Sequence, residues 1–269
     1  MIAFPPCKIN LGLHVVAKRA DGYHDIETCF FPVLWTDVLE IIPASEFQFT
    51  SSGIDIPGKE NENLCIKAFA LLREAFKIPF VKIHLHKIIP MGAGLGGGSS
   101  DAAHTLRLLN IIFELKLSTE QLKNYAAQLG SDCSFFIQDE PMLGTGRGET
   151  LNPISVNLAG YYLVLVKPNV HVSTKDAYGG LTPKTPISKI TEVLQQPVKS
   201  WRGLLINDFE SSVFQKFPEI EKVKNRLYEL GATYACMSGS GATVFGLFEK
   251  PGSFRNEFLN FEYWEGQLK

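Results

Sequence analysis

The chain has few of the features that mark secreted, membrane-spanning or nucleic-acid-binding proteins. Its five cysteines are scattered, odd in number and form no Cys-x-x-Cys pair, which disfavours both a disulfide framework and a zinc cage. The longest apolar run, around "YYLVLV", is far shorter than the roughly 18 residues of a membrane span. No dense Lys/Arg tract is present and the net charge is −2, which disfavours nucleic acid as a partner. Because the amino terminus also lacks a signal-peptide pattern, the sequence predicts a cytoplasmic protein without a membrane partner.

The 269 residues are enough for two domains of mixed α/β structure. Alternating or continuous apolar patterns predict strands over 8–19, 30–43, 46–53, 80–89 and 161–168, and a strand pair joined by a Gly/Ser turn over 233–249. Helical spacing predicts helices over 61–77, 99–115, 118–130 and 218–231. Ser and Asp at 99–101 are expected to cap the second helix, and Ser118 and Gln121 have capping-box spacing. We expect one boundary near residue 155, which gives domains 1–155 and 156–269.

The most unusual stretch is a glycine-rich loop between a predicted strand and a predicted helix. Five of the seven residues from Gly92 to Gly98 are glycine, and two serines and an aspartate follow. Bare backbone N–H groups at the start of a helix form an anion site, because the helix dipole adds partial positive charge there. The loop lacks the Gly-Lys-[Ser/Thr] of a Walker loop, and its five glycines exceed what a dinucleotide-binding turn needs. A flexible linker would have no reason to join a strand to a helix, so the pattern predicts a phosphate-binding loop.

At this point the chain resembles the GHMP kinases, which include galactokinase and the homoserine, mevalonate and phosphomevalonate kinases. "PMGAGLGGGSSDAA" is similar to their phosphate loop and "MSGSGATVFGLF" to their third motif. The blocks "CKINLGLHV", "RADGYHDIET", "GSDCSFFI" and "GRGE" resemble one branch, whose acceptor carries cytidine diphosphate. The resemblance covers nearly the whole chain. Cys7 replaces a common alanine and Ser134 a common proline, and neither change removes a reacting group.

The resemblance implies an ATP-dependent kinase with an amino-terminal ATP-binding α/β domain, a carboxyl-terminal ferredoxin-like domain and an active site in the cleft between them. It implies that ATP is held by the loop from Pro90 to Ser100, and it implies Mg²⁺, for which Ser99 or Ser100 are candidate ligands while the full ligand set stays open. The loop residues in question are Pro90, Met91, Gly92, Ala93, Gly94, Leu95, Gly96, Gly97, Gly98, Ser99 and Ser100.

Two residues are expected to carry the chemistry. From its strand-like surroundings alone, Lys8 could be a solvated lysine of an edge strand. Asp132, which follows Gly130, could equally be a helix cap or a turn former. The resemblance instead implies that Lys8 holds the γ-phosphate and that Asp132 accepts the proton of the attacking hydroxyl.

Other residues are expected to bind the acceptor. Tyr23 and His24 lie in a predicted turn, where simple turn packing is the alternative. The resemblance implies that Tyr23 stacks on a cytosine, that His24 hydrogen-bonds the edge of the base and that Tyr178 covers its other face. Asn10, two residues from Lys8 on the same strand face, and Thr174 complete this expected set.

Three further features remain open on the sequence alone. His84 and His86 share one strand face, but without a third ligand a polar outer face explains them better than a metal site. "GTGRGE" fits a hairpin turn at least as well as a second anion loop. Cys133 has no evident base beside it and is predicted to be a buried thiol. Acceptors such as homoserine or mevalonate, and a nucleotide-binding module without activity, are the alternative functions.

Overall fold

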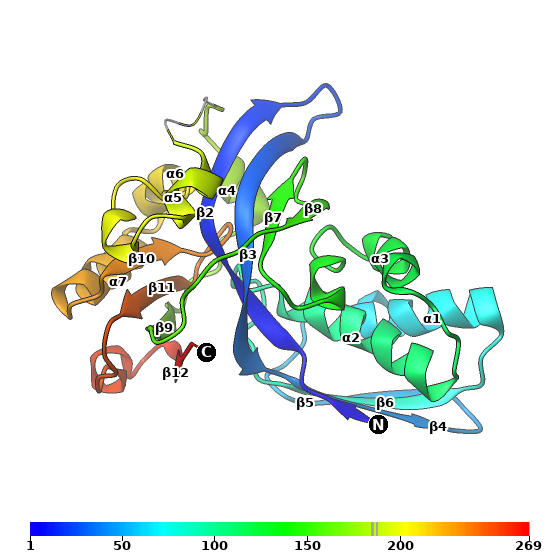
Figure 1. Cartoon of the computed structure of the whole chain (residues 1–269). Helices are drawn as coiled ribbons and strands as arrows, with labels where there is room; N and C mark the ends of the chain where they lie inside the picture. Colours follow the sequence, from blue (N-terminus) through cyan, green and yellow to red (C-terminus); the bar gives the residue numbers. More distant parts are fainter. Residues whose placement is uncertain (184–185, 187, 269) are drawn as a thin grey trace. The chain divides into compact units, whose positions relative to one another are not determined.

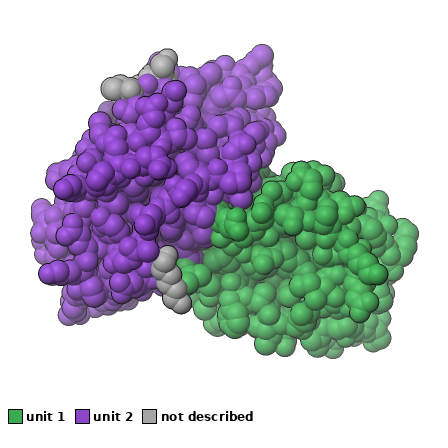
Figure 2. All heavy atoms as spheres, in the orientation of Figure 1, with its two compact units in different colours: residues 1–7, 34–91, 96–140 green, residues 8–33, 92–95, 141–269 purple. Residues whose placement is uncertain are grey.

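The computed structural model describes residues 1–183, 186 and 188–268 of the chain, which form two compact units. Unit 1 comprises residues 1–7, 34–91 and 96–140, and unit 2 comprises residues 8–33, 92–95 and 141–269 (Figure 2). This grouping differs from the single boundary expected near residue 155. The reason is that residues 8–33 pack with the carboxyl-terminal part of the chain, as the contacts of Leu13 and Val15 below show.

Unit 1 is a sheet with helices on one face (Figure 1). The strand order is β1-β4-β6-β5, and only the β5–β6 pair is parallel. Side chains of β6 alternate between buried and solvent-facing, as its "VKIHLHK" pattern predicts. The N-cap of helix α1 is Asn63, whose side chain accepts a hydrogen bond from the Cys65 N–H at 2.9 Å. The elements of this unit are β1 (Ile2–Ala3), β4 (Val38–Pro43), β5 (Gln48–Gly53), α1 (Leu64–Phe76), β6 (Val81–Lys87), α2 (Gly97–Ile112) and α3 (Thr119–Ala127), with 3₁₀ helices at Glu60–Glu62 and Phe135–Ile137.

Unit 2 contains most of a sheet with the strand order β2-β3-β7-β8 and all of a sheet with the order β10-β11-β9-β12; residues 6–7 of β2 and 34–36 of β3 belong to unit 1. The second sheet is antiparallel; in chain order its strands run 4-1-3-2, the order of a ferredoxin-like split βαβ unit. The strands are β2 (Pro6–Lys18), β3 (His24–Thr36), β7 (Met142–Thr145), β8 (Thr150–Pro153), β9 (Tyr162–Lys167), β10 (Tyr234–Met237), β11 (Val244–Phe248) and β12 (Glu262–Gln267). The helices are α4 (Thr174–Tyr178), α5 (Ile190–Leu194), α6 (Glu210–Lys216) and α7 (Pro218–Glu229), with 3₁₀ helices at Val198–Ser200 and Arg255–Phe258.

Strand β2 belongs to the core of unit 2. Leu13 and Val15 are buried in the same apolar cluster as Val166 of β9 and Val223 of α7. The Leu13 N–H donates to the carbonyl oxygen of Ile206 at 2.9 Å, and the Val15 N–H donates to the Asp208 carboxylate at 2.9 Å. These contacts join the amino-terminal strand to a segment about 190 residues further along the chain.

Most predicted elements are confirmed, and the start of α2 is corrected. The capping box of α3 forms as predicted, since the Gln121 N–H donates to Ser118 Oγ and the Ser118 N–H donates to the Gln121 side chain. Helix α2, however, begins at Gly97 rather than at residue 99, and its N-cap is Gly96 in a left-handed conformation without a side-chain cap. The serines and Asp101 therefore lie inside the first turns of the helix, where Asp101 bonds a lysine instead of capping.

No helix in the described part of the chain has the length and apolar character needed to cross a membrane.

Candidate functional site

The glycine-rich loop has an alternating left-handed backbone. Gly92, Gly94 and Gly96 have φ values of 59°, 74° and 70°, a region that side-chain-bearing residues rarely adopt. Residues 92–95 belong to unit 2, whereas the residues that precede and follow them belong to unit 1. The conformation alone therefore requires three of the five glycines that mark this loop.

One of these glycines is also required by packing within the protein. A Cβ on Gly94 would lie 2.2 Å from the carbonyl oxygen of Ser238, in the turn between β10 and β11. Ser238 Oγ donates to the Gly94 carbonyl at 3.0 Å, and the Thr243 N–H donates to the Ala93 carbonyl at 3.3 Å. The turn between β10 and β11 thus holds the loop through the Ser238 hydroxyl and the Thr243 N–H, and the bare backbone at Gly94 serves the fold itself.

Lys8, a residue of β2, contacts this same loop segment. Its side chain is only 3% exposed, which excludes the solvated edge-strand lysine. Its Nζ donates to the Gly94 carbonyl at 3.0 Å and to Asn10 Oδ1 at 2.6 Å, and its backbone N–H donates to the Leu95 carbonyl at 2.9 Å. A charge this deeply buried persists only where polar partners compensate for lost hydration. The ammonium is therefore fixed in position beside the loop.

Asn10 orients Lys8 and is itself held from both sides. While Oδ1 accepts from Lys8, Nδ2 donates to Thr28 Oγ1 at 3.0 Å, and the backbone N–H of Asn10 donates to Ser238 Oγ at 3.2 Å. Asn10 is 2% exposed. Its position makes it a support for Lys8, while the expected contact with the acceptor stays a prediction.

The start of α2 leaves polar groups and space for a ligand. A Cβ on Gly98 would meet no atom within 4 Å, and Gly98 is not among the glycines with positive φ, so neither packing nor backbone conformation requires glycine there. Ser100 Oγ is buried and has no hydrogen-bond partner among the described residues. An unpaired buried hydroxyl is costly unless a ligand or ion completes it. Both features are typical of a helix start that receives a phosphate.

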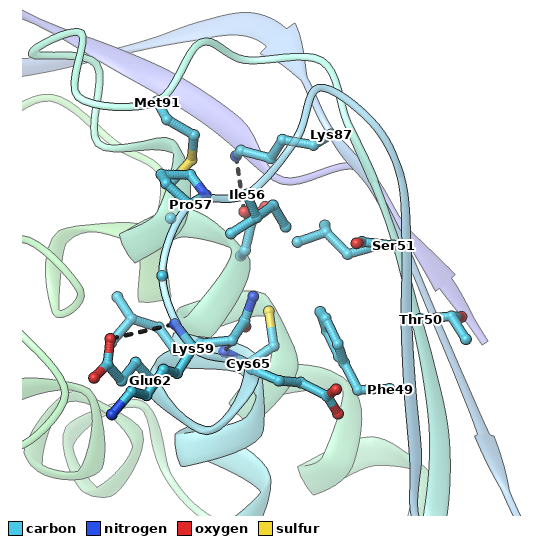
Figure 3. Close-up of a pocket in the computed structure, with 17 residues that line it drawn as sticks. Phe49, Thr50, Ser51, Ile56, Pro57, Lys59, Glu62, Cys65, Lys87 and Met91 are labelled. Atoms are coloured by element: carbon cyan, nitrogen blue, oxygen red, sulfur yellow. Dashed lines mark hydrogen bonds and ion pairs between the residues drawn. The ribbon is translucent and has the colours of Figure 1, made fainter. Parts of the chain in front are cut away.

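A pocket of about 340 Å³ opens beside this helix start, wholly within unit 1. Its lining includes Gly98, Met91, Lys87 and residues of the segment 56–65. Figure 3 shows Met91 and Lys87 at one end of the pocket and Glu62 and Phe49 toward the other. Sequence reasoning missed this pocket, because its segment "IPGKENEN" reads only as a polar connection between a strand and a helix.

A buried charge cluster anchors the first residues of the loop. Lys87 is 1% exposed; its Nζ contacts the carboxylate of Asp37 and lies 2.9 Å from Asp101 Oδ2. Asp37 Oδ1 accepts from the N–H groups of Ile88 and Ile89 at 2.6 and 2.8 Å. Burial, opposed by Lys87 and assisted by the nearby Asp37, raises the pKa of Asp101 to about 7. Burial disfavours the charged form of Lys87, but the two carboxylates outweigh it and raise the pKa of Lys87.

Asp132 lies in unit 1, in the turn that follows α3. It is half-buried, and Ser131 Oγ donates to its Oδ1 at 3.3 Å. The neighbouring Cys133 is buried as predicted, and burial raises the pKa of its thiol to about 11. The roles expected for Asp132 and Lys8 remain predictions.

The residues expected to bind a base lie in unit 2. Tyr23 is 57% exposed, and the guanidinium of Arg147 lies 5.1 Å from its ring centroid. His24 stacks on Tyr178, with ring centroids 4.5 Å apart and an interplanar angle of 21°. The expected partners thus form one stacked pair and one exposed ring. Thr174, the first residue of α4, is exposed.

The remaining sequence features have structural explanations. Thr50 Oγ1 and Ser52 Oγ lie 2.8 and 3.0 Å from the ring nitrogens of His84, and Ser52 Oγ lies 2.9 Å from His86 Nδ1. The described residues contain no group of three His, Cys, Asp or Glu side chains that could hold a metal ion. "GTGRGE" forms the hairpin turn between β7 and β8, where the Arg147 N–H donates to the Glu149 carboxylate at 2.6 Å.

Both parts of the chain match models of a single kinase class. Residues 63–140 match the GHMP kinases N terminal domain, and residues 193–260 match the GHMP kinases C terminal domain. Apart from residues 92–95, the first segment belongs to unit 1, and the second segment belongs to unit 2. The structure of a mevalonate kinase from Methanococcus jannaschii has the same fold, with a TM-score of 0.74 over 100% of this chain and 98% of that one, at 14% identity.

Relatives with higher sequence identity identify the family within this kinase class. A protein of Cytophaga hutchinsonii named 4-diphosphocytidyl-2-C-methyl-D-erythritol kinase is 52% identical over 97% of this chain and 98% of its own length. A crystal structure of 4-(cytidine 5'-diphospho)-2C-methyl-D-erythritol kinase is similar with a TM-score of 0.83 at 35% identity, over 99% of this chain and 98% of that one. The chain therefore belongs to the 4-diphosphocytidyl-2-C-methyl-D-erythritol kinase family of the GHMP kinases.

Proposed function

We propose that the protein transfers the γ-phosphoryl group of ATP to the 2-hydroxyl of 4-diphosphocytidyl-2-C-methyl-D-erythritol, in the non-mevalonate route to isoprenoid precursors. The observation that carries the proposal is the 52% identity, over almost the full length, to a relative of that name. The buried Lys8, which contacts the glycine loop, supports the proposal, because phosphoryl transfer needs a fixed cation where negative charge spreads.

Lys8 and Asp132 divide the chemical work in this proposal. Lys8, held by Asn10 and the Gly94 carbonyl, stabilises the charge on the transferred phosphoryl group. Asp132 orients the acceptor hydroxyl and takes its proton late, as the oxygen bonds to phosphorus. A carboxylate is a weak base towards an alcohol, so orientation contributes more than basicity.

The nucleotide is expected to use the loop and the start of α2. The N–H groups that follow Gly96 and the open space at Gly98 suit phosphate oxygens, and the pocket beside them suits the rest of ATP. The unpartnered Ser100 hydroxyl fits Mg²⁺, which prefers oxygen ligands, and Ser99 is the second candidate. When bound, Mg²⁺ neutralises charge on the phosphates.

The acceptor is expected to bind through unit 2. The exposed ring of Tyr23 offers one face for the cytosine, and Tyr178, on which His24 stacks in the free protein, is proposed to cover the other face. His24 is proposed to hydrogen-bond the edge of the base. Thr174 and Asn10 are proposed to contact the rest of the acceptor. We place the reaction in the cytoplasm, because all five cysteines are buried free thiols, as a reducing compartment favours.

The test is ADP release with Mg²⁺–ATP and a panel of acceptors. The cytidine acceptor is compared with its uridine analogue, homoserine and mevalonate. Turnover confined to the cytidine compound supports the proposal, including base recognition. Turnover with homoserine or mevalonate keeps the kinase class and rejects the roles of Tyr23 and His24. ATP binding without any turnover identifies a nucleotide-binding module without activity.

A further inference from the structure

One side chain in contact with the glycine loop has no part in the function described so far. The imidazole of His171 covers Gly92: a Cβ on that glycine would lie 2.9 Å from its Cε1 and 3.0 Å from its Nδ1. Both residues belong to unit 2. The φ of 59° disfavours residues with a side chain at position 92, and the bare glycine lets the imidazole approach the backbone this closely.

His171 lies next to a residue that is fixed in the core. Val172 is 3% exposed and belongs to the apolar core of unit 2. Its Cγ2 would lie 3.7 Å from a Cβ placed on Gly241. His171, the residue before Val172, is exposed. Among the described residues, no hydrogen bond satisfies either ring nitrogen of His171. An imidazole carries at least one N–H donor in either protonation state, so the ring of His171 offers a donor that no described residue uses.

His171 and Lys8 contact the same four-residue segment. Lys8 Nζ binds the carbonyl of Gly94, and the His171 ring lies on Gly92, two residues away. A histidine N–H is a strong donor to an anion. The Lys8 ammonium at Gly94 and the His171 ring at Gly92 together suit a chain of phosphates better than the Lys8 charge alone.

We propose that His171 binds a phosphate group seated on the loop at Gly92. The proposal rests on the kinase function given above. The phosphate belongs either to ATP or to the diphosphate of the acceptor, and both present the same oxygen chemistry to the ring.

The experiment uses His171→Ala, His171→Gln and, as a matched control, His86→Ala, which removes an exposed histidine from β6. The KM values for ATP and for the cytidine acceptor are measured, and calorimetry follows the binding of each ligand alone. We expect His171→Ala to raise the KM and Kd of one of the two ligands about tenfold or more, since a hydrogen bond to a charged group is lost. His171→Gln, which retains an N–H donor, should recover part of the loss. The control should match the wild type.

The phosphate itself is tested with unphosphorylated ligands. Binding of adenosine and of cytidine should be the same in His171→Ala and the wild type, and the ligand whose Kd rises identifies the source of the phosphate. The inference is overturned if both KM values and both Kd values stay within twofold of the wild type, or if the nucleosides weaken equally. It is also overturned if only kcat falls, because the ring would then merely shape the loop. Absence of wild-type turnover would reject the proposed function, while the ATP calorimetry would still test His171.

Discussion

Alanine substitutions at two glycines of the same loop should have opposite effects on stability. Gly98→Ala adds a methyl group to open space at the second residue of α2, where the backbone is helical. Gly94→Ala adds one at φ of 74°, with its Cβ 2.2 Å from the Ser238 carbonyl oxygen. The two positions lie four residues apart, so the pair separates the needs of the ligand from the needs of the fold.

The magnitudes follow from these two environments. In a helix, alanine is favoured over glycine by up to about 1 kcal/mol, so Gly98→Ala should leave the free protein as stable or slightly more stable. At Gly94, a left-handed alanine costs about 1–2 kcal/mol, and relief of the overlap with Ser238 costs a further 1–3 kcal/mol. A loss of about 3 kcal/mol lowers the Tm of a chain of this size by roughly 10 °C.

Thermal unfolding of both variants without ligands, followed by calorimetry with Mg²⁺–ATP, measures these effects. Gly98→Ala should weaken ATP binding about tenfold or more, because its methyl group occupies space that the phosphates need; tenfold corresponds to about 1.4 kcal/mol. An ATP affinity of Gly98→Ala equal to that of the wild type would refute the reasoning that the bare backbone at Gly98 serves a ligand. A Tm of Gly94→Ala equal to that of the wild type would refute the packing argument.

Four further predictions concern chemistry, acceptor binding, pH and thiol access. Asp132→Asn should lower kcat by about 10²–10⁴-fold with ATP affinity unchanged, as steady-state kinetics and calorimetry would show, and normal turnover would reject the proposed base. Tyr23→Ala should raise the KM of the cytidine acceptor without affecting ATP, and equal weakening of both ligands would reject stacking. Burial raises the pKa of Asp101 to about 7, whereas the ordinary aspartate pKa in the unfolded chain is about 3.9. Between about pH 3.9 and pH 7 the folded protein therefore binds more protons than the unfolded chain, so the free energy of unfolding falls as the pH rises through this range. Urea unfolding from pH 4 to 7 should show a contribution of up to about 1.4 kcal/mol per pH unit that Asp101→Asn abolishes, and an unchanged slope would contradict this assignment. All five cysteines are buried, and burial raises the pKa of Cys29 to about 12 and that of Cys133 to about 11. None of the five thiols should therefore react with a thiol reagent at pH 8 until the protein is unfolded. Rapid labelling of the native protein would show that a thiol is accessible.

Local patterns predicted the local structure well. The alternation in "VKIHLHK" identified β6, and the spacing of Ser118 and Gln121 identified the start of α3, because the interactions involved span only a few residues. The glycine loop was also located from its neighbours, a strand before it and a helix after it. The start of α2 was misplaced because a left-handed Gly96 lets two further glycines enter the helix, which propensity alone disfavours.

Contacts distant in sequence explain what the sequence could not show. The partner that requires glycine at position 94 is Ser238, 144 residues away. Asp101 has the residue type of a helix cap but bonds Lys87, which lies 14 residues earlier at the end of β6. His171 is a single histidine between two valines, and nothing around it in the sequence indicates the loop that it covers.

The packing of β2 limits how this protein can be divided for expression. A fragment of residues 156–269 would lack Leu13 and Val15, which fill the apolar core of unit 2, and would leave the backbone of residues 206–208 without its partner strand. It would also lose the Asn10 and Gly94 groups that meet Ser238. We expect such a fragment to aggregate when produced alone and to be rescued by co-production of residues 1–155, so isotope labelling or ligand screening of this half requires the whole chain or the reassembled pair.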